Sequence, residues 1–220
     1  MRVVIAGAHG QVARRLGRLL TGRGDTVVGI ARNPAHESDL VGDGVEPAIL
    51  DLEAATLEQV AGLLTDADAV VFAAGAGPGS GAERKHTVDH AAAVLLADAA
   101  ERAGVRPYVL VSSMGVQEAK EGPPPGMDPV FAVYLQAKVR AEEEILPRPA
   151  LDVTVVRPGR LTDEPGTGRV TLRHSVPFGD VPRDDVAEVL AELLREPRAG
   201  GVVELVGGDT PVAEAVAALS

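Results

Sequence analysis

Apolar and polar positions alternate along the chain with two periods that recur from one end to the other. Residues 2–6 (RVVIA) form a short apolar, β-branched run that is typical of a buried strand. After a glycine-containing turn, Val12, Leu16, Leu19 and Leu20 recur at helical spacing, with arginines on the opposite face. Repetition of this unit predicts parallel strands whose connecting helices cover both faces of a sheet.

Further strand-like and helical patterns continue the alternation. The expected strands are residues 26–31, 47–50, 69–73, 108–111, 153–156 and 202–206. The expected helices begin at Thr56, where Gln59 stands in a capping position, and cover residues 89–103, 130–146, 183–195 and 212–219. Glycine- and proline-rich loops are expected at residues 75–81 and 121–129, the second with three prolines at 123–125. We therefore predict an α/β fold: a Rossmann-type, doubly wound parallel sheet of about seven strands in a single domain, residues 1–220.

The composition excludes several classes of function. The formal net charge of −11 argues against nucleic acid or an anionic membrane as the main partner. The absence of cysteine excludes disulfides, thiolate catalysis and cysteine–metal sites. No apolar run approaches the ~18 residues of a membrane helix, and the first apolar run is too short for a signal peptide. We therefore expect a cytoplasmic protein, either a monomer or a homodimer.

The turn after the first strand has the chemistry of a dinucleotide-binding loop. Residues 7–13 read GAHGQVA, with the spacing G-x-x-G-x-x-A. Gly7 allows a tight turn, Gly10 lets a pyrophosphate approach the backbone, and Ala13 permits close packing of the helix on the strand. The positive end of the helix dipole then faces the anion. The alternative is an ordinary glycine turn that opens an α/β domain. The residues expected to face a cofactor here are Gly7, His9, Gly10, Gln11 and Val12.

The carboxyl ends of the other strands should line the same ligand site. The second strand ends at Arg32 without an acidic residue, which favours NADP(H) over NAD(H), because a guanidinium can bind a 2′-phosphate bidentately. The alternative is a surface arginine with no ligand. The later strand ends add further expected cofactor contacts, namely Asp51, Leu52, Ala73, Ala74, Gly75 and Ser112.

Tyr134 and Lys138 form the strongest catalytic candidate. Residues four positions apart share a helix face, so a phenol and an ammonium group can point at one site. The positive charge should lower the pKa of Tyr134 and make it a better proton donor and acceptor, while Lys138 also holds the nicotinamide ribose. The alternative is an incidental pair on an exposed helix. Only three lysines and two tyrosines are present, so this spacing would rarely arise by chance.

Together these motifs resemble the atypical short-chain dehydrogenases/reductases, a group of small NAD(P)-binding proteins related to NmrA-like, biliverdin-reductase-B-like and NAD-dependent epimerase/dehydratase proteins. The matching motifs are the glycine turn, the small residues at 73–75, the VSS sequence at 111–113, the Tyr134–Lys138 spacing and the VRPG sequence at 156–159. The resemblance implies NADP(H)-dependent hydride transfer to a small carbonyl, quinone-like or flavin-like acceptor. It also places Pro158, Gly159 and Leu161 beside the nicotinamide, with small substrate-side elements at about residues 157–185.

The sequence departs from this family in two places. The catalytic group of the family is Asn, Ser, Tyr and Lys, but the Asn position holds Asp89, which cannot donate a hydrogen bond as an amide does. Some relatives carry the active serine where this chain has Met114, so Ser113 is the expected catalytic serine and Ser112 the second choice.

Two other functions remain open from the sequence. A nucleotide-sugar epimerase or dehydratase would share the fold but usually has a larger substrate region. A non-catalytic NADP(H)-sensing regulator would keep the cofactor site alone, and the exchange at Asp89 favours it. His86 and His90 have a spacing that could seat a metal on a helix, but no third ligand is evident, so we expect no metal site.

Overall fold

The computed structural model of the chain describes residues 1–77, 79–120, 122, 126–195 and 200–219. Its strands are β1 (Arg2–Ala6), β2 (Thr26–Ala31), β3 (Glu46–Ile49), β4 (Ala69–Phe72), β5 (Pro107–Val111), β6 (Asp152–Pro158), β7 (Arg160–Thr162), β8 (Arg169–Arg173), β9 (Asp180–Pro182), β10 (Gly201–Gly207) and β11 (Thr210–Pro211). Its α-helices are α1 (Gln11–Gly22), α2 (Glu37–Gly42), α3 (Leu57–Leu63), α4 (Ala82–Arg84), α5 (Ala92–Ala103), α6 (Val116–Lys120), α7 (Pro129–Ile145), α8 (Arg183–Leu193) and α9 (Val212–Ala217). A 3₁₀ turn covers Pro34–His36 and a π-helical segment covers Lys85–Ala91.

The central sheet has the strand order β11-β8-β10-β6-β5-β4-β1-β2-β3 within the described residues. The strands from β3 to β10 are parallel, so the predicted doubly wound parallel sheet of about seven strands is confirmed. Reversal of the strand order between β1 and β4 creates the crevice where this fold binds ligands. The site therefore belongs at the carboxyl ends of β1 and β4.

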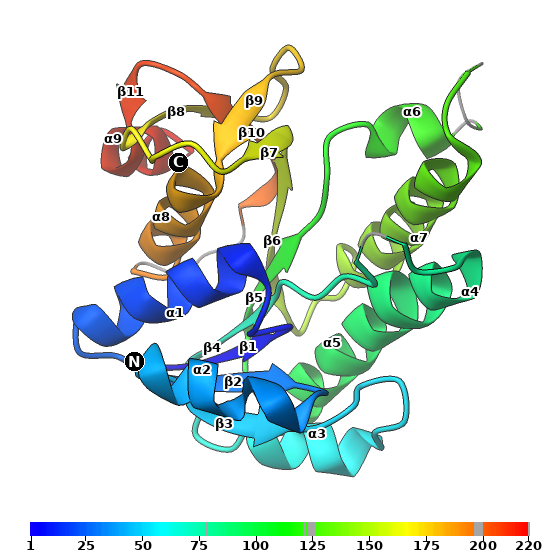
Figure 1. Cartoon of the computed structure of the whole chain (residues 1–220), viewed down its shortest axis with the longest axis vertical. Helices are drawn as coiled ribbons and strands as arrows, with labels where there is room; N and C mark the ends of the chain where they lie inside the picture. The colour runs from blue at the N-terminus through cyan, green and yellow to red at the C-terminus, as the bar shows by residue number, and fades with distance from the viewer. Residues whose placement is uncertain (78, 121, 123–125, 196–199, 220) are drawn as a thin grey trace.

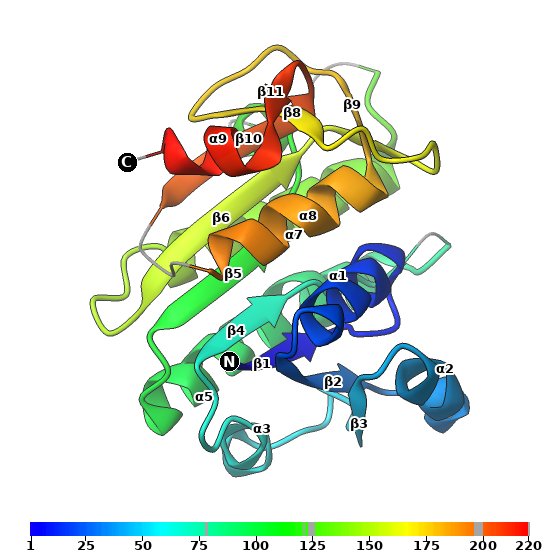
Figure 2. The same cartoon turned by 90° about the vertical axis from the view of Figure 1, so that its left-hand side faces the viewer.

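Helices cover both faces of the sheet (Figures 1 and 2). Helices α1, α8 and α9 lie on one face, and α3, α5 and α7 lie on the other. Each face has its own mainly aliphatic core: Leu16 and Leu190 belong to the first, and Leu96 and Ile145 belong to the second, which also holds Phe72 and Tyr108. Leu19, which the helical pattern placed on the buried face of α1, is 43% exposed because it lies at the margin of that face.

The turn between β1 and α1 has the predicted strand–turn–helix form. Gly7 has a φ of +78°, and a side chain on it would come within 2.4 Å of the Cα of Ala74. Only glycine fits this position, because the backbone is left-handed and a neighbouring strand end lies against it. Gly10 has extended backbone angles and precedes α1 without a side-chain cap, so the first N–H groups of the helix are left free for a ligand. Ala13 is 2% exposed, as close packing requires.

Several local predictions are also confirmed. Thr56 and Gln59 form a reciprocal capping box at the start of α3. The helix expected at 89–103 is formed by the π-helical segment and α5, so its first turn is wider than expected. Helix α7 begins at Pro129, with the carboxylate of Asp128 accepting a hydrogen bond of 2.8 Å from the N–H of Phe131. The predicted three-proline run at 123–125 lies outside the described residues.

The small elements expected at about residues 157–185 include three strands, β7, β8 and β9, that the sequence analysis did not predict individually. Strands β8 and β11 extend the sheet in antiparallel fashion beyond β10, and β7 pairs with β9 as a separate short ribbon. A side chain on Gly159 would come within 2.0 Å of the carbonyl oxygen of Gly179, so the chain passes from β6 into β7 by close backbone packing. Among the described residues, no helix is both long and apolar enough to span a bilayer.

Candidate functional site

A cleft runs along the carboxyl ends of the parallel strands and divides into two pockets. The first, of about 290 Å³, lies between the glycine turn and the ends of β2 and β3, and we call it the β2–β3 pocket. The second, of about 560 Å³, lies between the glycine turn and α7, and we call it the α7 pocket. Both are lined by Gly10, Ala73, Ala74 and Gly75. The shared lining makes one continuous cleft suited to an extended ligand.

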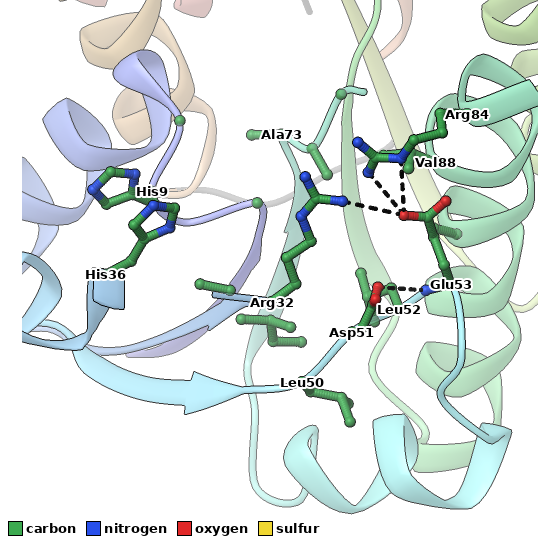
Figure 3. A pocket seen from close by; sticks show the side chains of 17 residues that line it. His9, Arg32, His36, Leu50, Asp51, Leu52, Glu53, Ala73, Arg84 and Val88 are labelled. Atoms are coloured by element: carbon green, nitrogen blue, oxygen red, sulfur yellow. Dashed lines mark hydrogen bonds and ion pairs between the residues drawn. The ribbon is translucent and has the colours of Figure 1, made fainter. Parts of the chain in front are cut away.

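The β2–β3 pocket is rich in cationic side chains that converge on one carboxylate (Figure 3). Arg32 follows β2, and its guanidinium lies 3.4 Å from an oxygen of Glu53. Arg84, from α4, binds the same oxygen at 2.8 Å. The hydrogen bond from Arg84 lowers the pKa of Glu53 against the opposing effect of burial, so Glu53 is ionised at neutral pH.

Glu53 corrects one premise of the sequence analysis. The second strand does end without an acidic residue, but Glu53 enters the same pocket from the segment after β3. Because β2 and β3 are neighbouring parallel strands, their carboxyl ends meet although 21 residues separate Arg32 from Glu53. The preference for a 2′-phosphate therefore depends on how the cationic residues of the pocket compete with Glu53.

Two histidines form the other side of the β2–β3 pocket. The rings of His9, in the glycine turn, and His36, after β2, stack with centroids 3.5 Å apart (Figure 3). Asp39 accepts a hydrogen bond from His9 at 2.8 Å. Burial and the neighbouring His9 lower the pKa of His36, so its ring is neutral at pH 7. The pair gives the pocket a flat wall that offers ring nitrogens to a phosphate.

The α7 pocket contains a buried ion pair below the phenol of Tyr134. The Nζ atom of Lys138 lies 3.5 Å from the Oδ1 atom of Asp89, and it donates a hydrogen bond of 3.1 Å to the carbonyl oxygen of Val111. Lys138 is 3% exposed and Asp89 is fully buried. Asp89 also accepts a hydrogen bond of 3.2 Å from the N–H of Ala76. The carboxylate thus fixes the loop after β4 to helix α7.

The electrostatics of Tyr134 differ from the prediction. Burial raises the pKa of its phenol far above the ordinary value, and the charge of Asp89 raises it further, whereas a hydrogen bond with Ser113 lowers it. The predicted depression of this pKa by Lys138 is therefore wrong in the cofactor-free chain. Burial lowers the pKa of Lys138 itself, although Asp89 partly restores it. The main reason for the raised pKa of Tyr134 is burial of the phenol, and the charge of Lys138 is in addition offset by Asp89.

The two serines after β5 have different partners. Ser113 contacts the phenol of Tyr134, as expected of the catalytic serine, and donates a hydrogen bond of 2.9 Å to the carbonyl oxygen of Met114. The hydroxyl of Ser112 instead donates to Glu142 at 2.5 Å, inside a buried network in which Glu142 also pairs with Arg157. Ser112 therefore lines the α7 pocket with its hydroxyl committed to structure.

Most predicted site residues do lie along the cleft. The β2–β3 pocket is lined by Gly7, His9, Gly10, Arg32, Asp51, Leu52, Ala73, Ala74 and Gly75. The α7 pocket is lined by Gln11, Val12, Asp89, Ser112, Tyr134, Lys138, Pro158 and Leu161. The exceptions are Ser113 and Gly159, which line neither pocket. Gly159 packs against Gly179, so its predicted cofactor contact is corrected to a packing role.

Sequence reasoning missed residues that reach the cleft from distant elements. In the β2–β3 pocket these are His36, Glu53 and Arg84; in the α7 pocket they are Lys85, Phe131 and Arg183. Lys85 carried a usable signal, since it is one of only three lysines and follows the glycine-rich loop after the fourth strand. For Glu53 and Arg84, which are 31 residues apart, no local pattern indicates the contact.

The shape of the cleft fits a dinucleotide. The uncapped N-terminus of α1 lies at its centre, and the first turn of that helix holds no acidic residue, so an anion is favoured there. A side chain on Gly10 would approach the carbonyl oxygen of Gly7 to 3.1 Å and would occupy the helix end. One pocket on each side of Gly10 can then take one end of the ligand.

Comparisons with known proteins agree with this geometry. A family model described as NAD(P)H-binding matches residues 7–197. The protein YhfK of Bacillus subtilis (strain 168), which bears the name of an uncharacterized sugar epimerase, is 33% identical over 218 residues, with 98% of this chain and 99% of YhfK covered.

Solved structures show the same similarity. A protein of Bacillus halodurans named for the NAD-dependent epimerases/dehydratases matches with a TM-score of 0.88 at 35% identity, covering 99% of both chains. ChuY, an anaerobillin reductase from Escherichia coli O157:H7, matches with a TM-score of 0.80 at 25% identity, covering 95% of this chain and 98% of its own.

Proposed function

Because the chain belongs to the NAD(P)H-binding family, within the atypical short-chain dehydrogenases/reductases, we propose that it is an NADP(H)-dependent oxidoreductase acting on a small carbonyl, quinone-like or flavin-like acceptor. The observation that carries the proposal is the buried group of Tyr134, Lys138 and Asp89 in the α7 pocket. A phenol held beside the ligand cleft is a proton donor in the place where a reduced acceptor would need one.

Each residue of this group has its own task. When bound, the nicotinamide cofactor supplies the hydride. Tyr134 donates a proton to the oxygen on which negative charge develops, and its raised pKa keeps the phenol protonated at neutral pH. Ser113, hydrogen-bonded to that phenol, orients it. Lys138 and Asp89 hold α7 against the loop after β4, which fixes the distance between Tyr134 and the cleft.

A direct test follows NADPH oxidation against a panel of aldehydes, quinones and flavins. Tyr134→Phe keeps the ring and removes the proton, so the rate should fall about 10²–10⁴-fold with little change in NADPH affinity. Tyr108→Phe is the matched control, since this second tyrosine is fully buried away from the cleft and donates its hydroxyl to the carbonyl oxygen of Ala93. Full turnover by Tyr134→Phe would overturn the assignment of the proton donor.

We also propose that NADP(H) is preferred over NAD(H). Arg32, His36 and Arg84 line the β2–β3 pocket around the expected place of the 2′-phosphate, and a guanidinium binds phosphate through charge-assisted hydrogen bonds. Glu53 opposes this preference by pairing with both arginines. Arg32 and Arg84 face two carboxylates in this pocket, those of Asp51 and Glu53, so the preference requires the phosphate to displace Glu53 from both arginines.

Two variants test the preference from opposite sides. Arg32→Ala should weaken NADPH binding about tenfold, the equivalent of about 1.4 kcal/mol, and leave NADH nearly unchanged. Glu53→Gln removes the competing charge and should raise the ratio of NADPH to NADH affinity. Arg106→Ala is a suitable control, because Arg106 pairs with Asp152 at the amino ends of β5 and β6, at the other end of the strands from the cleft. Equal losses of NADPH and NADH affinity in Arg32→Ala would contradict this role.

One observation favours an alternative reaction. Both YhfK and the Bacillus halodurans protein bear epimerase names, so the panel should include a nucleoside diphosphate sugar. Conversion of such a sugar without net NADPH consumption would replace the reductase proposal with an epimerase. Tight NADPH binding without turnover of any compound would point to a cofactor-sensing protein.

A further inference from the structure

Lys85 places an unpaired positive charge inside the α7 pocket. It is the first residue of the π-helical segment and is only 7% exposed. Its Nζ atom donates a hydrogen bond of 2.9 Å to the carbonyl oxygen of Gly77 and lies 5.3 Å from the centroid of the Tyr134 ring. A π-helical turn of this kind is common where a helix serves a functional site.

The other cations of the pocket have carboxylate partners. Lys138 pairs with Asp89, and Arg183 pairs with Asp163 at 2.9 Å. Lys85 forms no ion pair with any carboxylate that the structure describes. A buried charge without a counter-ion is costly, and a protein with 32 acidic and 21 basic residues has ample means to supply one. The missing partner suggests that a bound anion completes the site.

The surroundings of Lys85 indicate what carries the anion. The ring of Phe131 stacks on that of Tyr134 with centroids 5.7 Å apart, and both Val130 and Phe131 are 46% exposed at the pocket wall. Two adjacent exposed apolar side chains at the wall of a pocket form a surface that an apolar ligand can cover. The pocket thus offers apolar contact on one wall and a single unpaired ammonium group at its base.

Resting on the proposed function, we propose that the acceptor is an aromatic or otherwise apolar molecule that carries an acidic group, and that Lys85 binds this group. Lys85 is then a specificity-determining residue: it holds the carboxylate, sulfonate or phosphate of the acceptor while the apolar wall holds its body. Its position beside Tyr134 places the reducible part of the acceptor within reach of the proton donor.

The cofactor phosphates are the competing source of an anion. The uncapped N-terminus of α1 at Gly10 is the place where the fold receives a pyrophosphate. Lys85 instead lies over the ring of Tyr134, on the α7 side of the pocket. We therefore expect Lys85 to act on the acceptor and to leave NADPH affinity unchanged.

A binding experiment tests the proposal without requiring turnover. Calorimetry on the NADPH-loaded protein compares naphthalene-2-sulfonate with its neutral isostere, naphthalene-2-sulfonamide. The wild-type protein should bind the sulfonate at least about tenfold more tightly, and Lys85→Gln should abolish this difference. Lys120→Gln is the matched control, because Lys120 is exposed, pairs with Glu143 and carries the same charge away from the cleft.

A kinetic arm uses 4-carboxybenzaldehyde and its methyl ester, which differ mainly in charge. Lys85→Gln should raise KM for the acid about tenfold, leave KM for the ester unchanged and preserve kcat. Binding that depends on Lys85, without turnover of either aldehyde or of any aldehyde, quinone or flavin of the panel, would overturn the oxidoreductase assignment while keeping the anion site. Equal affinity of the wild-type protein for the two naphthalenes would overturn the anion site itself.

Two further measurements separate the remaining explanations. If Lys85→Gln weakens NADPH binding as strongly as sulfonate binding, the anion belongs to the cofactor and the proposal is wrong. Lys85→Met should raise the thermal midpoint of the ligand-free protein, since it removes a buried unpaired charge. A fall in the midpoint of several degrees would show that the bond to Gly77 has a structural role and would contradict the proposal.

Discussion

Asp89 gives the α7 pocket an electrostatic balance that an amide would not. Its carboxylate is fully buried, neutralises Lys138 at 3.5 Å and raises the pKa of Tyr134. The family resemblance places Asn at this position, where the lysine charge would act on the phenol without a neighbouring anion. Aspartate in place of asparagine at position 89 therefore keeps the phenol of Tyr134 protonated.

The first prediction concerns the pH dependence of turnover. Asp89→Asn removes the negative charge that raises the pKa of Tyr134, so that pKa should fall. Reduction requires the protonated phenol, and its rate is lost as pH rises through this pKa. The alkaline limb of the kcat–pH profile should therefore move to lower pH in Asp89→Asn. Asp98→Asn, which changes a half-buried carboxylate on α5 that pairs with Arg148, should leave the profile unchanged.

An unchanged profile in Asp89→Asn would show that Tyr134 does not control the alkaline limb. A large loss of rate at every pH, with the limb in place, would show that Asp89 acts only by positioning the loop after β4 through its hydrogen bond with Ala76. The two results are distinguishable in a single titration of activity.

At the scale of elements, helices and strands with a strong local sequence pattern were predicted well, and those with a weak pattern were missed. The strands and long helices were predicted within a few residues, because their apolar periods are strong and each follows a turn signal. Strand β8 was missed although Val170 and Leu172 alternate with polar residues, because five residues at a sheet edge make a weak signal. The antiparallel return of the chain there is set by pairing with β10, which no local pattern encodes.

The site was predictable where its residues are close in sequence. Tyr134 and Lys138 lie on the same face of α7 and line the same pocket, as their spacing predicted, and the glycine turn has its predicted form. The ion pairs of Glu53 with Arg32 and Arg84 join separate elements, and the charge balance around Tyr134 depends on burial. Neither the ion pairs between separate elements nor the effect of burial leaves a periodic pattern in the sequence, so both could be found only in the folded structure.

The second prediction concerns the junction of α1 with the end of α2. Asp43 has a side chain only 7% exposed, and it accepts hydrogen bonds from Arg14 at 2.6 Å and from Arg18 at 2.9 Å. Burial alone would raise the pKa of Asp43, but the two arginines outweigh it and hold this pKa below its usual range. Asp43→Asn should reduce the free energy of unfolding by about 1–3 kcal/mol at pH 7, measured in urea.

The sign of the pH effect follows from the depressed pKa. The contribution of Asp43 is complete above its unfolded-state pKa and is lost as pH falls through its lower folded-state pKa. The stability difference between the wild-type protein and Asp43→Asn should therefore shrink below about pH 4. Asp209→Asn is the control, because Asp209 is exposed and its carboxylate makes no ion pair with a described residue. A pH-independent difference would contradict the role of the ionised carboxylate.

At the scale of the whole molecule, the ligand cleft joins the two halves of the sheet. The glycine turn follows β1, Ala73–Gly75 follows β4, and the pockets on either side reach β3 in one direction and β6 in the other. The two aliphatic cores pack against opposite faces of this same sheet. A ligand bound along the cleft contacts residues from nearly every parallel strand. Its binding should therefore raise the free energy of unfolding of the whole domain.

The last prediction uses this coupling to separate the two glycines of the turn. NADPH at 100 times its Kd should raise the thermal midpoint of the wild-type protein by about 5–10 °C, since such binding adds about 2.7 kcal/mol. Gly10→Ala introduces one tight contact of 3.1 Å and blocks the helix end, so its cofactor-free midpoint should stay within a few degrees while the NADPH shift disappears. Gly7→Ala should instead unfold the protein, because its φ is +78° and its side chain would lie 2.4 Å from Ala74. A Gly10→Ala protein that keeps the full NADPH shift would show that the pyrophosphate does not lie at the start of α1.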